Sequence, residues 1–181
     1  VLDEDSKAVS GLDYAESVGY VPLQPGDYEV DIVKTGSTII DSLYKSVLSL
    51  DPMTSYTVVA FETSKGLELQ ITEDYRTQDM VTLTAEIRAS HLIDVVDKVD
   101  VYVLFNTNAD KTSNQVKLID NLAFQYPQGY LEIPAQQYRI GLDVDQDEKI
   151  DLTYDLPQLV HGDIVDLYAA LNTEGLPVIY T

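Results

Sequence analysis

The stretch QPGDYEVDI at positions 24–32 decides the fold, because a turn signal runs directly into strict alternation of apolar and polar residues. In an extended strand, Tyr28, Val30 and Ile32 point to one face and the residues between them point to the other. This period of two residues is typical of a half-buried β-strand. The proline and glycine ahead of it favour a tight turn. The segment therefore predicts a strand that begins at a turn.

The same pattern returns in the second half of the chain. The stretch PAQQYRIGL at positions 134–142 repeats the alternation, with Tyr138 at an offset of 110 positions from Tyr28. After one deleted residue the match continues at an offset of 109 positions, as from Gly66 to Gly175. We interpret the chain as two tandem copies of one module. Further matched pairs are Leu12/Leu122, Gly19/Gly129, Tyr20/Tyr130, Val30/Ile140, Ile32/Leu142, Leu50/Leu159, Val58/Leu167 and Ala60/Ala169.

The remaining segments favour an all-β fold, since runs rich in Val, Ile, Tyr and Thr alternate with turn signals. Only positions 39–50 and 92–96 could be helical, and neither combines a cap with an apolar stripe. We expect two tandem antiparallel β-sandwiches, immunoglobulin-like or transthyretin-like, at positions 1–76 and 77–181, with the polar segment 72–79 as their junction. The other expected strands cover positions 56–61, 67–71, 81–91, 99–105, 116–124, 164–171 and 176–180.

The first module is expected to lack its opening strands. The second module opens with the strands expected at 81–91 and 99–105, whose counterparts at the same offset would lie ahead of Val1. Three explanations are open: the chain is a trimmed or mature product, the first module is smaller, or another chain supplies a strand to the exposed edge. A signal peptide or lipid anchor would lie upstream of Val1.

The composition excludes several classes of function. The 181 residues carry 31 acidic and 11 basic side chains, and the net charge of −20 repels nucleic-acid phosphates, so we expect no nucleic-acid partner. The chain has no cysteine and therefore no disulfide, thiolate nucleophile or cysteine-bound metal. No apolar run reaches the roughly 18 residues of a membrane span, so we expect no transmembrane segment. We also expect no cofactor.

Arg88, His91 and Asp100 form the most conspicuous polar group of the sequence. As a hydrolase site, His91 would act as a general base that Asp100 orients, with Ser90 as a possible nucleophile. As a structural site, the three side chains would form a hydrogen-bonded cluster that pins the first hairpin of the second module. The sequence offers no oxyanion loop, nucleophile elbow or second base, so we expect the structural role and no enzyme activity.

Asp143, Asp145, Asp147 and Asp151 resemble the start of a calcium loop, because carboxylates at alternate positions supply the oxygen ligands that calcium prefers. An EF-hand loop needs Gly at its sixth position and Glu at its twelfth, and the chain has Glu148 and Tyr154 there. We therefore expect a solvated acidic hairpin tip without metal. The alternative is a β-sandwich calcium site.

Several short motifs resemble a family of exported bacterial proteins called domain of unknown function 4397. Arg88-Ala89-Ser90-His91 followed by Val99-Asp100-Val101-Tyr102-Val103 resembles its opening, 24–28 and 134–138 resemble its turn into a strand, and 50–58 resembles a later element. The loop at 92–97 and Gln136 depart from the family pattern. The resemblance implies an exported, often lipid-anchored tandem β-sandwich protein without an established activity.

These observations lead to one expected function and two alternatives. We expect a non-catalytic structural or binding module of the cell envelope, exported to the periplasm or the cell surface, with an unknown protein or glycan as partner. The first alternative is a hydrolase that uses His91 with Ser90 or Asp100. The second is a calcium-stabilised module of the adhesin type.

Overall fold

The structure, a computed structural model, confirms the all-β prediction. It describes residues 9–37, 41–75, 83–104 and 115–181, and these contain no α-helix. In this part of the chain, no helix is long and apolar enough to cross a membrane. The strands are β1 (Gly26–Ile32), β2 (Tyr44–Leu50), β3 (Tyr56–Thr63), β4 (Gly66–Glu73), β5 (Thr84–His91), β6 (Lys98–Leu104), β7 (Gln115–Ala123), β8 (Leu131–Pro134), β9 (Arg139–Asp143), β10 (Leu152–Asp155), β11 (Ile164–Leu171) and β12 (Pro177–Tyr180).

The chain divides into two compact units. Unit 1 comprises Val1–Ala60 and Leu67–Asp74, and unit 2 comprises Phe61–Gly66 and Tyr75–Thr181. The boundary expected from the sequence, between positions 76 and 77, lies outside the described residues. The two segments with helical potential form no α-helix where the structure describes them. β2 occupies the second half of 39–50, and 92–96 forms a turn after β5.

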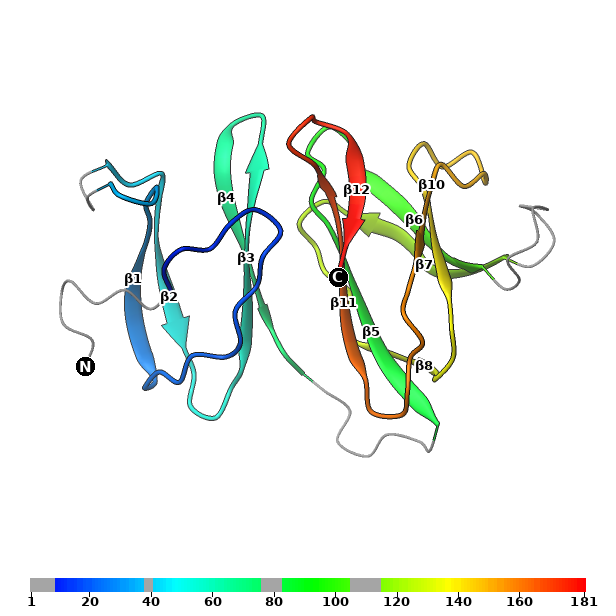
Figure 1. Ribbon diagram of the computed structural model, residues 1–181, viewed down its shortest axis with the longest axis horizontal. Helices are drawn as coiled ribbons and strands as arrows, with labels where there is room; N and C mark the ends of the chain where they lie inside the picture. The colour runs from blue at the N-terminus through cyan, green and yellow to red at the C-terminus, as the bar shows by residue number, and fades with distance from the viewer. Residues whose placement is uncertain (1–8, 38–40, 76–82, 105–114) are drawn as a thin grey trace. The chain divides into compact units, whose positions relative to one another are not determined.

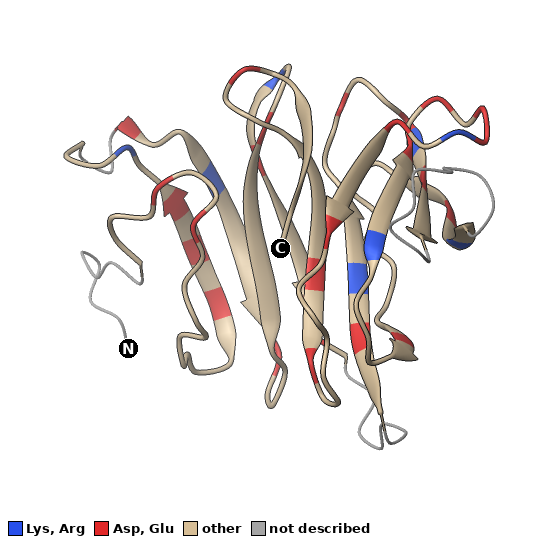
Figure 2. Ribbon diagram, turned by 45° about the vertical axis from the view of Figure 1, so that its right-hand side comes forward, with Lys and Arg blue, Asp and Glu red and all other residues tan. Residues whose placement is uncertain are grey.

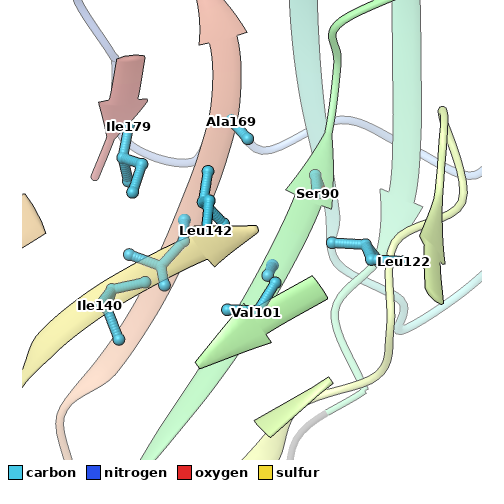
Figure 3. Close-up of a pocket in the computed structure, with 9 residues that line it drawn as sticks. Ser90, Val101, Leu122, Ile140, Leu142, Ala169 and Ile179 are labelled. Carbon is cyan, nitrogen blue, oxygen red and sulfur yellow. The ribbon is translucent and has the colours of Figure 1, made fainter. Parts of the chain in front are cut away.

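Unit 2 contains two four-stranded sheets, with the strand orders β10-β9-β6-β7 and β12-β11-β5-β8 (Figure 1). Alternate residues of these strands are buried together in one hydrophobic core, as expected for a β-sandwich. A cavity of only about 10 Å³ lies in this core, so the packing is close (Figure 3). Core residues include Ala85, Ile87, Val99, Val101, Leu122, Ile140, Leu142, Leu156, Leu159, Leu167 and Ala169.

One strand pair differs from the antiparallel arrangement that the sequence predicts. β5 and β11 run parallel, with Glu86 opposite Ile164 and His91 opposite Ala169. The other neighbour of β5 is the antiparallel β8, so this sheet is mixed. Alternation along a strand identifies its buried face but carries no information about the direction of its neighbours. A parallel pair needs a long connection, which the chain provides by passing through the opposite sheet.

Unit 1 repeats only part of this arrangement. Its described strands lie in two hairpins, β1-β2 and β3-β4, apart from the tip Phe61–Gly66 of the second hairpin, which belongs to unit 2. These hairpins correspond in sequence to β9-β10 and β11-β12. The hydroxyl of Tyr28 donates to the carbonyl of Gln24 at 2.7 Å, and the hydroxyl of Tyr138 donates to the carbonyl of Pro134 at 2.8 Å. The same tyrosine contact therefore recurs at the offset of 110 positions. The gene duplication that would explain this recurrence stays a prediction.

Candidate functional site

His91 lies at the end of β5 with no exposed surface. Its Nε2 is 2.8 Å from the carbonyl of Val96, and its Nδ1 accepts from the backbone amide of Ile93 at 3.4 Å. Because a carbonyl can only accept, Nε2 carries the proton. Because Nδ1 accepts a hydrogen bond, it carries no proton, and the ring is therefore neutral. Burial lowers the pKa of His91, although the Val96 carbonyl partly opposes this effect. Both ring nitrogens are thus engaged with the backbone.

Arg88 lies three residues before His91 on β5 and belongs to a separate polar group. Its Nε donates to Asp166 on β11 at 2.6 Å, and its guanidinium lies 4.4 Å from the ring centre of Tyr130. The hydroxyl of Tyr130 donates to the same carboxylate at 3.2 Å. Asp166 is directly opposite Arg88 in the parallel pair. The arginine is only 3% exposed, so this buried ion pair ties β5 to β11.

Asp100 lies on β6, in the other sheet. Its carboxylate accepts from the Lys117 ammonium at 2.6 Å and from the backbone amide of Asn121 at 2.7 Å. Burial alone would raise the pKa of Asp100, but the Asn121 amide and the lysine lower it below its ordinary value. The hydrogen bonds from Lys117 to Asp100 and then to Asp120 raise the pKa of the lysine. Asp100 therefore ties β6 to β7.

The structure gives these three residues different partners instead of a shared site. Arg88 and His91 belong to β5, and Asp100 lies in the opposite sheet with its carboxylate bonded to β7. Ser90 is 3% exposed and lines the small core cavity. In place of the expected cluster of Arg88, His91 and Asp100, the structure therefore shows three separate sets of contacts.

The acidic loop, residues 143–151, connects β9 to β10 and brings three carboxylates together. One oxygen each from Asp143, Asp145 and Asp151 lies within 4.8 Å of the others. Asp143 has no exposed surface, and the other two are exposed. Carboxylates at this separation could share a divalent cation, because calcium accepts several oxygen ligands in a flexible arrangement. Figure 2 shows acidic residues in many parts of the chain, with few basic ones among them.

Asp143 organises the backbone of the acidic loop. Its two carboxylate oxygens accept from the amides of Asp147 at 3.2 Å and Glu148 at 2.9 Å. Gln146 and Glu148 adopt positive φ angles of 59° and 65°, which turn successive amides towards one acceptor. Glu148 thus takes the backbone conformation that glycine provides at the sixth position of an EF-hand loop. The positive φ angle at this position is thus reached without glycine.

Asp147 does not join the three converging carboxylates. It is paired with Lys149, which lowers the pKa of Asp147, and the hydrogen bond to Asp147 raises the pKa of Lys149. Asp151 instead accepts from the amide of Val144 at 2.7 Å and so closes the base of the loop. Of the four aspartates expected from the sequence, the structure brings together three. The twelfth position, Tyr154, lies on β10.

Gly141 on β9 lies under the side chain of Ile150, near the end of the acidic loop. Sequence reasoning gave this glycine no role. A Cβ atom at this position would lie 3.0 Å from the Cδ1 and Cγ2 atoms of Ile150. The absence of a side chain therefore lets Ile150 pack over β9, which draws the end of the loop onto the sheet. Sequence reasoning also did not identify the contacts that Asp166, Tyr130 and Lys117 make with Arg88 and Asp100, because these contacts join separate strands.

Comparison with known proteins gives one family. None of the curated proteins matches the chain. The pattern of the family described as Domain of unknown function (DUF4397) matches residues 1–102, which is more than half of the 181 residues. The match covers unit 1 and reaches into β6, so it includes Arg88, His91 and Asp100. The resemblance seen in the sequence is confirmed, and the chain belongs to the family Domain of unknown function (DUF4397).

Proposed function

We propose that the chain is a non-catalytic structural or binding module of the bacterial cell envelope that holds another protein or a glycan. Its exported location, in the periplasm or at the cell surface, is proposed from what the family resemblance implies. The outer strands of unit 2 support a binding role. Among the described residues, β7, β8, β10 and β12 each have one strand neighbour, and a free strand edge can add a strand from a partner.

The observation that carries the non-catalytic part of the proposal is the state of His91. Its side chain is buried, and both ring nitrogens are hydrogen-bonded to backbone groups. A general base needs a nitrogen that can reach a proton of the substrate. Asp100 is bonded to Lys117 and Asn121, so it does not supply the orienting contact of a catalytic pair.

A turnover screen with a matched variant tests this part. The full chain and His91→Gln are assayed against panels of ester, peptide, phosphate and glycoside substrates, with circular dichroism as the control for folding. We expect no turnover that depends on His91. Turnover by the wild type that a folded His91→Gln variant has lost would favour the hydrolase alternative.

The binding part needs a purified partner. The immobilised full chain is exposed to envelope extract and to a glycan array, and each retained molecule is purified and titrated by calorimetry. We expect saturable binding of a protein or a glycan with a fixed stoichiometry. If every retained molecule fails to saturate, the binding role is wrong.

We propose calcium stabilisation as a second candidate, because Asp143, Asp145 and Asp151 converge in the acidic loop. A cation bound only by the folded chain would raise its melting temperature by mass action. Millimolar calcium is expected to raise the melting temperature of the wild type, and a chelator is expected to reverse the gain. Asp145→Asn should lose this response, and Glu174→Gln, which removes an exposed charge elsewhere in unit 2, should keep it. An equal response in both variants would show only general charge screening.

A further inference from the structure

The turn after β5, residues 92–97, contacts His91 on one side and the tip of the β3–β4 hairpin on the other. This tip, Phe61–Gly66, belongs to unit 2. We propose that the arrangement is an acid-sensitive clasp, in which the neutral ring of His91 keeps the turn bound to the tip and protonation of the ring releases the tip. The clasp consists of His91, Asp94 and Phe124 together with Phe61 and Ser64 of the tip.

The ring of His91 fixes the shape of the turn through both of its nitrogens. Nε2 donates to the carbonyl of Val96 at 2.8 Å, and Nδ1 accepts from the amide of Ile93 at 3.4 Å. The amide of Val96 also donates to the carbonyl of Ile93 at 3.2 Å. Ile93 is only 1% exposed, so the start of the turn is anchored in the core. The two contacts with His91 therefore hold both ends of one short turn.

Asp94 lies in the same turn, between the two residues that contact His91, and it binds the tip. Its carboxylate accepts from the backbone amide of Ser64 at 2.6 Å. Hydrogen bonds from the hydroxyl and the amide of Ser64 lower the pKa of Asp94 below its ordinary value of 3.8, and the charge of Lys65 acts in the same direction. Asp94 is therefore charged throughout the pH range in which a histidine titrates.

A row of three aromatic rings forms a second contact between His91 and the tip. The rings of Phe124 and His91 meet edge to face, with their centres 6.0 Å apart and their planes at 77°. Phe61 meets the same Phe124 ring at 6.2 Å and 80°. Phe61 is buried. The tip is thus connected to His91 by packing as well as through Asp94.

A proton on Nδ1 of His91 removes one of the contacts that hold the turn. The protonated ring has two N–H donors, and the new donor would face the N–H group of Ile93, which cannot accept it. The charge would also lie on a ring with no exposed surface, and burying an unpaired charge is costly. Opening the turn lets the ring reach water and avoids this cost. Asp94 moves with the turn, so its bond to Ser64 is lost.

The charged groups near His91 do not stabilise its protonated form. Burial lowers the pKa of His91, the Val96 carbonyl partly opposes this effect, and no charged side chain shifts it. Asp94 is engaged with Ser64, and Asp166 with Arg88. The titratable groups on the described segments in contact with the ring or the turn are Glu62 and Lys65 of the tip, Asp94 and Asp97 of the turn, Tyr126 after β7, and Asp166 and Tyr168 of β11.

His91 is the only member of the clasp whose charge changes at mildly acidic pH. Its pKa in the folded chain lies below the ordinary value of 6.5, so the ring is neutral at pH 7 and takes up a proton as the pH falls through that lowered pKa. Asp94 loses its charge only below 3.8. Release of the tip between these two ordinary values is therefore caused by the histidine.

A pH titration followed by nuclear magnetic resonance tests the clasp in the full chain. The amide of Ser64 reports the hydrogen bond to Asp94, and the ring nitrogens of His91 report its protonation. From about pH 7.5 to about pH 4.5, the Ser64 amide proton should shift upfield with the same midpoint as the ring of His91. Amides in β9 should keep their positions, because the rest of unit 2 stays folded.

Matched variants assign the release to His91. The side chain of His91→Gln offers a donor and an acceptor at every pH, so its Ser64 amide should not shift over this range. His161→Gln removes the second of the two histidines of the chain and should titrate as the wild type does. Asp94→Asn weakens the acceptor and should place the Ser64 amide upfield already at pH 7.5.

Three results would overturn the proposal. The first is a Ser64 amide that stays in place while His91 titrates, and the second is an equal shift in the wild type and in His91→Gln. The third is a change of the β9 amides together with Ser64, since acid then unfolds the whole of unit 2. If His91→Gln does not fold, the two midpoints measured in the wild type decide the question.

Discussion

His91 shows how burial can fix a protonation state. The folded chain holds the ring neutral, because burial lowers its pKa from the ordinary value of 6.5. The unfolded chain takes up a proton near that ordinary value. Between the two pKa values the unfolded state binds more protons, so protonation favours unfolding. The free energy of unfolding should therefore fall as the pH decreases below about 6.5.

The pH dependence can be assigned to His91 with two variants. Chemical denaturation between pH 7.5 and pH 5 should show a slope of up to about 1.4 kcal/mol per pH unit in the wild type. His91→Gln should flatten this slope, whatever its effect on total stability. His161→Gln is the control, because His161 is exposed and should leave the slope unchanged. Equal slopes in both variants would contradict the assignment. The lowered pKa of Asp100 affects stability in a different pH range, below its ordinary value of 3.8.

The side-chain amide of Gln70 is buried without a hydrogen-bond partner among the described residues. It is 5% exposed, and neither Oε1 nor Nε2 has a hydrogen-bond partner among the described residues. The matched position of unit 2 holds the apolar Ile179. A buried polar group without partners costs about 1–3 kcal/mol. Gln70→Leu should therefore raise the free energy of unfolding by about 1 kcal/mol or more. A lower melting temperature would show that the amide is satisfied in solution.

The strands differ in how well sequence predicts them. β11 and β12 match their expected spans closely, because runs of branched and aromatic residues lie between clear turns. β8 and β10 have only four residues each, too few for alternation to be recognised. β2 was not predicted as a strand, because positions 39–50 were also compatible with a helix. The parallel β5–β11 pair was not predictable, since direction depends on the path of the whole chain.

The candidate sites were predicted less completely than the strands. The sequence identifies the aspartates of the acidic loop, but the missing glycine at the sixth position argues against a calcium loop. The structure shows Glu148 in the left-handed conformation that this position requires. The sequence singled out Arg88, His91 and Asp100 but did not identify their partners. The partners of Arg88 and Asp100 lie on β11 and β7, and no local pattern connects them, whereas His91 bonds to the loop directly after β5.

The β9–β10 hairpin depends on the space above Gly141. A Cβ atom there would meet Ile150 at 3.0 Å, so Gly141→Ala would force that side chain to shift. Such overpacking costs about 1–3 kcal/mol. We expect Gly141→Ala to lower the free energy of unfolding in a urea titration. Adding Ile150→Val should restore part of the loss, because it removes one methyl group at the contact. A single variant as stable as the wild type would show that Ile150 moves without cost.

At the scale of the whole molecule, the two units share hairpins but differ in completeness. The described part of unit 2 has two four-stranded sheets around one core, and the described part of unit 1 has two hairpins. The family match extends from unit 1 into β6, so the family pattern joins the incomplete unit to the opening strands of the complete one. The two units therefore share a hairpin plan, and the described part of unit 2 adds further strands to it.

Hydrogen–deuterium exchange on the full chain tests most directly the claim that β1 and β3 each have one strand neighbour among the described residues whereas β9 and β11 have two. β9 and β11 each lie between two neighbouring strands, so amides pointing to either side should be protected. In β1 and β3, amides that point away from β2 and β4 should exchange at least about tenfold faster than their matched amides in β9 and β11. Equal protection of the matched amides would mean that unit 1 is already covered in solution, and the claim would be wrong.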